Sequence, residues 1–134
     1  HEHMLVIAIF PVCEARGIPC YTSGGDGAYH ILGHVLAPDF AYKATPLSEI
    51  YPDPEPPLLV AEIISTNDRP NDIREKRNVY LEAGILYWEL YPKQPSIDVY
   101  EPGKPVRTLN IDDVLDGGDV LPGFLLPLRD VFLE

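Results

Sequence analysis

Apolar runs separated by proline and glycine predict several short strands along this chain. The most regular run is 58–65, Leu-Leu-Val-Ala-Glu-Ile-Ile-Ser, and its length and β-branched content predict a strand buried on both faces. Residues 85–91 predict a second buried strand. Residues 97–100 and 106–110 predict a two-stranded antiparallel addition around a Pro-Gly turn.

The first third of the chain is less regular. Residues 3–16 are apolar almost throughout and could form a helix packed on a sheet, but Pro11 would break or kink it, and the β-branched content keeps a strand open. Residues 18–22 and 28–36 look like strands around a glycine-rich turn. At the other end, residues 121–132 predict a loop followed by a short helical turn.

One helix is clearly indicated after the strand at 58–65. Residues 66–71 have turn and cap chemistry, and Gly84 is a natural stop. Positions three and four apart share a helix face, so Asp72, Lys76 and Tyr80 form one stripe, which we expect to face the sheet. The resulting strand–helix–strand unit, flanked by hairpins, predicts a mixed sheet in an α/β or α+β domain.

Glu62 places one carboxylate in the middle of the apolar run. An isolated buried carboxylate costs several kcal/mol, so it must be paired, protonated or bound to a cation. Asp39 begins another strand-like segment, and two carboxylates on neighbouring strands can hold a divalent metal. Lys76, on the sheet-facing stripe, would direct its ammonium group toward Glu62.

Two metal-free alternatives remain open for these charges. Lys76 could form an i,i+4 ion pair with Asp72 on the helix, which would contribute a few tenths of a kcal/mol. Alternatively, Glu62 could form a buried ion pair with Lys76 or Arg74.

Composition limits the classes of partner. At 134 residues the chain is long enough for one domain with a single core. Its net charge of -11 argues against tight, unaided binding of nucleic acid, although an enzyme that gathers a few basic groups around a metal is allowed. No apolar run is long enough to cross a membrane. Cys13 and Cys20 form no motif; a disulfide is allowed, but a reduced pair in a cytoplasmic protein is favoured.

Other candidate residues have simpler interpretations. His30 and His34 would suggest a metal pair on a helix, but in a strand-like segment they should share one face and be structural or surface groups. Tyr87 and Trp88 lie in a predicted buried strand, which favours core packing or a homodimer interface over base stacking.

Several fragments occur in an order and spacing typical of one family. They are Pro38-Asp39, residues 59–65, Asp72, Lys76 and Tyr80, residues 82–85, Tyr87-Trp88 and residues 121–124. From about residue 33 onward, the sequence resembles the Uma2 family (domain of unknown function 820), which is common in cyanobacteria and is assigned to the PD-(D/E)XK nuclease superfamily. The resemblance implies a restriction-endonuclease-like mixed central sheet flanked by helices, with an added antiparallel hairpin. It also implies one domain over residues 1–134 that lacks the N-terminal part of the family domain.

The resemblance further implies a metal-dependent endonuclease that hydrolyses phosphodiester bonds, with DNA as the expected substrate. Asp39, Glu62 and Lys76 would be the catalytic residues. Asp39, Glu62 and the backbone carbonyl of Ile63 would hold Mg²⁺ or Mn²⁺. Ile64 occupies the position where the superfamily usually has its lysine, so Lys76 must replace that lysine.

Two questions follow from the resemblance. An acidic residue that the superfamily often supplies from its first helix could be Glu2 or Glu14. The alternative function is a catalytically inactive interaction or assembly module of the same fold, which the acidic surface, Ile64 and the short N-terminus favour.

Overall fold

A six-stranded mixed sheet organises the fold. The structure is a computed structural model that describes residues 2–132, with the side chains of residues 3–132. The strand order is β1-β4-β5-β6-β7-β8, and neighbours are antiparallel except for the parallel pair β5 and β6. The elements are α1 (Glu2–Arg16), β1 (Tyr21–Gly24), β2 (Tyr29–Ile31), β3 (His34–Leu36), β4 (Phe40–Lys43), β5 (Leu59–Ile63), α2 (Pro70–Glu82), β6 (Leu86–Tyr91), β7 (Ser96–Tyr100), β8 (Arg107–Asn110), β9 (Val114–Gly117), β10 (Leu121–Pro127) and α3 (Leu128–Phe132).

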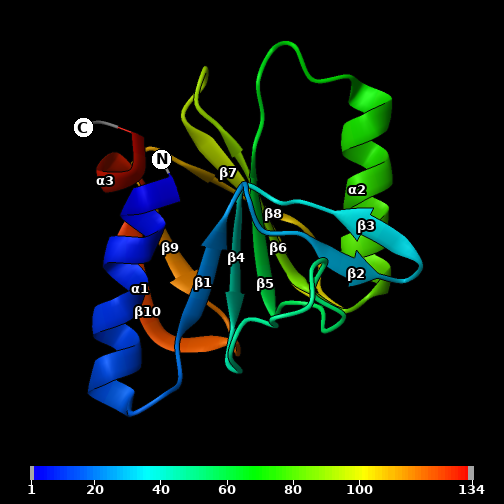
Figure 1. The fold of residues 1–134 in the computed structure, drawn as a ribbon. Helices are drawn as coiled ribbons and strands as arrows, with labels where there is room; N and C mark the ends of the chain where they lie inside the picture. The colour runs from blue at the N-terminus through cyan, green and yellow to red at the C-terminus, as the bar shows by residue number, and fades with distance from the viewer. Residues whose placement is uncertain (1, 133–134) are drawn as a thin grey trace.

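The two faces of the sheet have different covers. In Figure 1, α1 and the β9–β10 pair lie on one side of the sheet, and α2 with the β2–β3 hairpin lies on the other. Successive residues of a strand point to opposite faces. Leu59 and Ala61 therefore pack with α1, whereas Val60 packs with Tyr80 of α2 and Tyr87 of β6. This alternation confirms a strand buried on both faces within the run 58–65. The strand is shorter than the run, because it covers Leu59–Ile63 and the side chains of Leu58 and Ser65 are exposed.

Several predicted elements are confirmed. Helix α2 begins at Pro70 and ends just before Gly84, which adopts a φ of 74°. The predicted antiparallel addition is β7 paired with β8, and β7 also joins the central sheet beside β6. Residues 2–16 form the helix α1, and Pro11 lies within it. Pro11 is exposed, so the carbonyl group that it leaves without an N–H partner can be hydrated.

Two parts of the prediction were wrong. Residues 121–127 form the strand β10 rather than a loop, and its register against β9 shifts between Leu121 and Leu125. That irregularity accommodates Pro122 and Gly123, the residues that suggested a loop. Strand β1 pairs with β4 rather than with the strand after its turn, and residues 28–36 contain two strands, β2 and β3.

Cys13 is buried against the sheet, and both Cys13 and Cys20 are free thiols. Within residues 2–132, the helices are too short or too polar to cross a bilayer.

A buried ion pair attaches the proline-rich loop to the sheet. Lys43 at the end of β4 contacts Asp53 of the loop, with 2.8 Å between Nζ and Oδ2, and the two side chains are 3% and 8% exposed. Burial alone would raise the pKa of Asp53, but the hydrogen bonds from Lys43 and from the backbone N–H groups of Glu55 and Ser48 outweigh it and lower the pKa.

Replacing Lys43 by methionine should lower the free energy of unfolding at pH 7 by about 3 kcal/mol, because Asp53 loses the partner of its buried charge. Since the pKa of Asp53 is lowered in the folded state, the stabilisation is present above the usual carboxyl pKa and is lost as the pH falls through the lowered value. Urea unfolding of the wild type and of Lys43→Met between about pH 6 and pH 2 measures this effect. The difference between their free energies of unfolding should become smaller in acid. Lys104→Met, which breaks an exposed ion pair with Glu101, should cost less than about 1 kcal/mol. A Lys43→Met effect that is equal at all pH values would contradict this assignment.

Candidate active site

Asp39 and Ile63 meet where β4 begins and β5 ends. The backbone N–H of Ile63 donates a hydrogen bond to Oδ2 of Asp39 at 2.7 Å. The next N–H, that of Ile64, points the opposite way and donates to the carbonyl of Leu90. In an extended strand, the N–H and C=O groups of one residue point to the same side. The Ile63 carbonyl therefore faces the same edge as the Asp39 carboxylate.

Glu62 points from β5 toward helix α2. It is 6% exposed, and its Oε2 accepts a hydrogen bond of 2.8 Å from the hydroxyl group of Tyr80. Burial raises the pKa of Glu62 to about 7, despite the opposing effects of that hydrogen bond and of the positive charge of Lys76. The negative charge of Asp39 also raises this pKa. A bound cation would favour the ionised form of this carboxylate.

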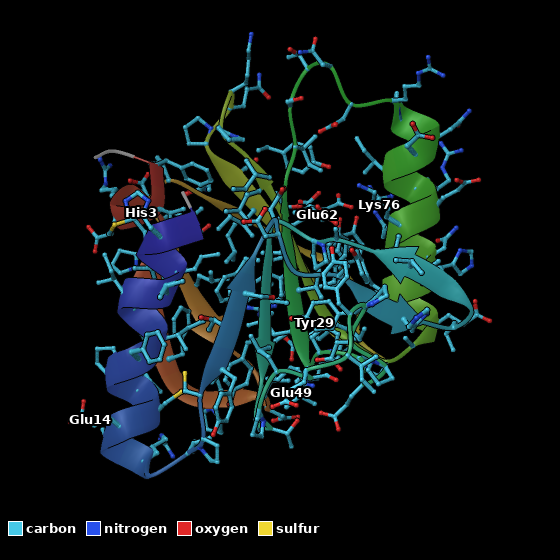
Figure 2. All side chains as sticks on the ribbon, in the orientation of Figure 1. His3, Glu14, Tyr29, Glu49, Glu62 and Lys76 are labelled. Carbon is cyan, nitrogen blue, oxygen red and sulfur yellow. The ribbon has the colours of Figure 1, made fainter. Side chains whose placement is uncertain are left out.

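Lys76 lies on α2, across from Glu62. Figure 2 shows the two residues on facing elements, and the attraction of Lys76 for the Glu62 carboxylate indicates that their charges are close. The side chain of Lys76 is exposed. Within residues 3–132, neither Lys76 nor Arg74 forms an ion pair, so both metal-free pairings that the sequence allowed are absent from the described structure.

The three predicted catalytic residues line one open cleft of about 800 Å³. They are Asp39, Glu62 and Lys76. Its walls are the end of β5 with the following loop, the N-terminal half of α2, and the segment from β3 to β4. Carboxylates outnumber cations around it. The charged lining residues are Asp39, Glu62, Asp68, Arg69, Asp72, Glu75 and Lys76, together with His34.

The donor set at the base of the cleft fits a hard divalent cation. Asp39 and Glu62 offer carboxylate oxygens and Ile63 offers a carbonyl oxygen, the ligand types that Mg²⁺ and Mn²⁺ prefer. Among the described residues, no group of three or more histidine, cysteine, aspartate or glutamate side chains is arranged to hold a metal ion. Mg²⁺ usually keeps several water ligands and needs one or two carboxylates, so two carboxylates are sufficient for such a site.

A second buried carboxylate lies beside Glu62 and was missed by sequence reasoning. Glu89 is the register partner of Glu62 on the parallel strand β6, and it is fully buried. Arg77 of α2 binds it with two hydrogen bonds, Nε to Oε2 at 2.8 Å and Nη2 to Oε1 at 2.9 Å. Tyr91 donates a further hydrogen bond of 2.7 Å to Oε1. The missed signal was the one that identified Glu62, a carboxylate within an apolar run.

Of the remaining candidates, His34 lines the same cleft as Asp39 and Glu62, whereas His30 does not. His30 and His34 lie on different strands, and their cross-strand partners are Val35 and Ile31, so they occupy opposite faces of the β2–β3 hairpin rather than one face. Glu14 is exposed on α1, on the other face of the sheet, and does not line the cleft. The side chain of Glu2 lies outside the described residues.

Comparison with solved structures identifies a relative with the same fold. A crystal structure of a protein from Anabaena variabilis ATCC 29413, described as a "putative nuclease belonging to DUF820", has the same fold, with a TM-score of 0.82 at 18% sequence identity. The alignment covers 98% of this chain and 77% of that one. No curated protein was found to match the sequence.

The sequence itself provides the family assignment. Residues 3–129 match the model of the Uma2 family, whose description is "Putative restriction endonuclease". The chain belongs to the Uma2 family. The resemblance that its motifs suggested is thereby confirmed, and so is the restriction-endonuclease-like fold.

Proposed function

We propose that this protein is a divalent-metal-dependent endonuclease that hydrolyses phosphodiester bonds of nucleic acid, with DNA as the expected substrate. The observation that carries the proposal is the environment of Glu62. This buried carboxylate has a raised pKa, lies next to Asp39 and opens onto a cleft that also contains Lys76. The Uma2 family description and the DUF820 relative support a nuclease.

Asp39, Glu62 and the Ile63 carbonyl would hold the Mg²⁺ or Mn²⁺ ion. When bound, such an ion acidifies water and neutralises phosphate oxygens. The protein supplies orientation: the N–H of Ile63 fixes the Asp39 carboxylate, and the hydroxyl group of Tyr80 fixes Glu62. Lys76 is free to swing into the cleft, where its ammonium group would stabilise charge that develops on the phosphate.

The charge of the cleft suggests an order of binding. Because carboxylates outnumber cations in its lining, a phosphate backbone would be repelled until a divalent cation has bound. We also place the protein in the cytoplasm, which agrees with the two free thiols.

An inactive module of the same fold is the second candidate. The exposure of Lys76 and the absence of an ion pair between it and Glu62 in the described structure favour it, because a catalytic lysine is usually held close to its carboxylate. Metal-dependent cleavage of nucleic acid by the wild-type protein would exclude this candidate.

Binding of Mn²⁺ to the isolated protein tests the metal site without requiring a substrate. Titration calorimetry should detect Mn²⁺ binding to the wild type, and Asp39→Asn should weaken it by about 100-fold, because a neutral amide replaces a ligand carboxylate. Asp26→Asn changes an exposed aspartate outside the cleft and should leave the affinity unchanged. No heat with the wild type, or equal affinity in Asp39→Asn, would overturn the proposed metal site.

A further inference from the structure

The turn of the β2–β3 hairpin contains an unusual leucine. Leu32 has a φ of 49° and the following Gly33 a φ of 82°, so both central residues of this two-residue turn are left-handed. Turns of this type favour asparagine followed by glycine, because asparagine tolerates positive φ better than other side chains. Among the described residues, Leu32 is the only non-glycine residue with a positive φ.

Packing does not explain why leucine occupies this position. Tyr29 and Ile31 are buried in one cluster with residues of the sheet and Tyr80 of α2, so the inner face of the hairpin supplies the core contacts. The side chain of Leu32 is 55% exposed, and Val35 on the outer face is 56% exposed. An asparagine at position 32 would relieve backbone strain and remove an apolar group from water. Folding alone therefore favours a different residue here.

The hairpin is next to the cleft. His34 and Leu36 of β3 contribute directly to the cleft lining, and in Figure 1 the hairpin crosses α2 with its tip projecting past the helix. Residues 28–37 contain neither aspartate nor glutamate, although the chain has 21 acidic residues. On the opposite wall, α2 and the turn before it contribute Arg69 and Lys76 but also three carboxylates. These are Asp68, Asp72 and Glu75. A nucleic-acid strand that extends beyond the cleft would meet the least repulsion along this hairpin.

We propose that the β2–β3 hairpin is a substrate-contacting element and that Leu32, at its tip, packs against an unpaired base where the nucleic acid extends beyond the cleft. The inference rests on the proposed nuclease function and specifies its substrate: nucleic acid with single-stranded nucleotides beside the cleft. Leucine can pack as an apolar side chain against the face of a base, and every base has such a face, so this contact adds affinity without sequence preference. The bases of an intact duplex are stacked on one another, and their faces are not available to such a side chain.

The test measures binding of fluorescently labelled oligonucleotides by anisotropy. Ca²⁺ replaces Mg²⁺ or Mn²⁺ in the buffer, so that binding is measured without cleavage. The full chain is compared with Leu32→Asn on a single strand, a forked duplex and a blunt duplex of equal length. Leu32→Asn should weaken binding to the single strand and the fork by about tenfold, because part of the burial energy of a leucine side chain is lost, and leave the weaker binding to the blunt duplex unchanged. Its unfolding temperature should be equal to or higher than that of the wild type, because asparagine suits the turn.

Two further variants sharpen the result. Leu32→Phe keeps an apolar contact and should retain the preference for the single strand, whereas Leu125→Asn alters an exposed leucine of β10 and should change no affinity. Equal binding of Leu32→Asn and wild type to all three oligonucleotides would overturn the inference and leave the nuclease proposal intact. Failure of the wild type to bind or cut any oligonucleotide would overturn both. If Leu32→Asn instead abolished self-association in light scattering, with oligonucleotide binding unchanged, the hairpin would be an interface between copies of the chain.

Discussion

Glu62→Gln should reduce metal-dependent cleavage on the order of 1000-fold while the protein stays folded, because the loss of one ligand carboxylate removes several kcal/mol of charge stabilisation. Glutamine has the shape of glutamate and can still accept the hydrogen bond from Tyr80. It also removes a charge that burial disfavours, as the raised pKa of Glu62 shows. In the presence of EDTA near pH 8, the variant should therefore unfold at a temperature no lower than that of the wild type.

Cleavage of a labelled DNA with Mg²⁺ or Mn²⁺, followed by thermal unfolding of the same samples, measures both effects. Glu49→Gln is the matched control, because Glu49 is exposed and lies outside the cleft (Figure 2). It should change neither the activity nor the stability. Full activity in Glu62→Gln would refute the proposed metal ligation.

Arg77→Met should lower the free energy of unfolding by about 3 to 5 kcal/mol, the largest stability loss that we expect from a single substitution in this chain. The change leaves the Glu89 carboxylate with no guanidinium partner, fully buried between α2 and the sheet. The contact of the Arg77 guanidinium group over the ring of Tyr100, at 5.2 Å from the guanidinium carbon to the ring centroid, is lost as well. Urea unfolding of the full chain measures the loss.

Arg107→Met provides the control for this prediction. Arg107 forms two ion pairs, with Glu101 and Asp116, but its side chain is 42% exposed. Exposed pairs contribute little, so this variant should lose less than about 1 kcal/mol. The double variant Arg77→Met/Glu89→Leu should recover much of the loss, because no buried charge is then left at position 89. Equal losses in Arg77→Met and Arg107→Met would contradict the role assigned to burial.

The central part of the fold could be predicted because its signals are local. The apolar run around Glu62, the polar turn before Pro70 and the stop at Gly84 each specify an element within a few residues. The pairing of β1 with β4 depends instead on contacts between distant segments, and local patterns do not encode it. Strand β10 was missed because Pro122 and Gly123 suggest a loop, and only the shifted register against β9 shows how a strand accommodates them.

The candidate site was predicted to a similar extent. A carboxylate in an apolar strand identified Glu62, and the helix period placed Lys76 opposite it. The same reasoning expected Lys76 as a direct partner of Glu62, whereas the hydrogen bond comes from Tyr80 on the next turn of the helix. Spacing assigns residues to a helix face, but it does not determine which side chain on that face contacts the partner residue. The catalytic roles of Asp39, Glu62 and Lys76 stay a prediction.

The bond between Arg77 and Glu89 has a consequence for altering this protein by directed evolution. Arg77 holds α2 to β6, and the neighbouring residues Lys76 and Tyr80 belong to the same rigid helix. A substitution that shifted α2 to widen the cleft would also have to break this buried pair, so variants on that wall should be lost through misfolding before they acquire new substrates. The β2–β3 hairpin carries no comparable pair in the described structure. Libraries that vary the hairpin turn should therefore yield altered substrate ranges at far higher frequency.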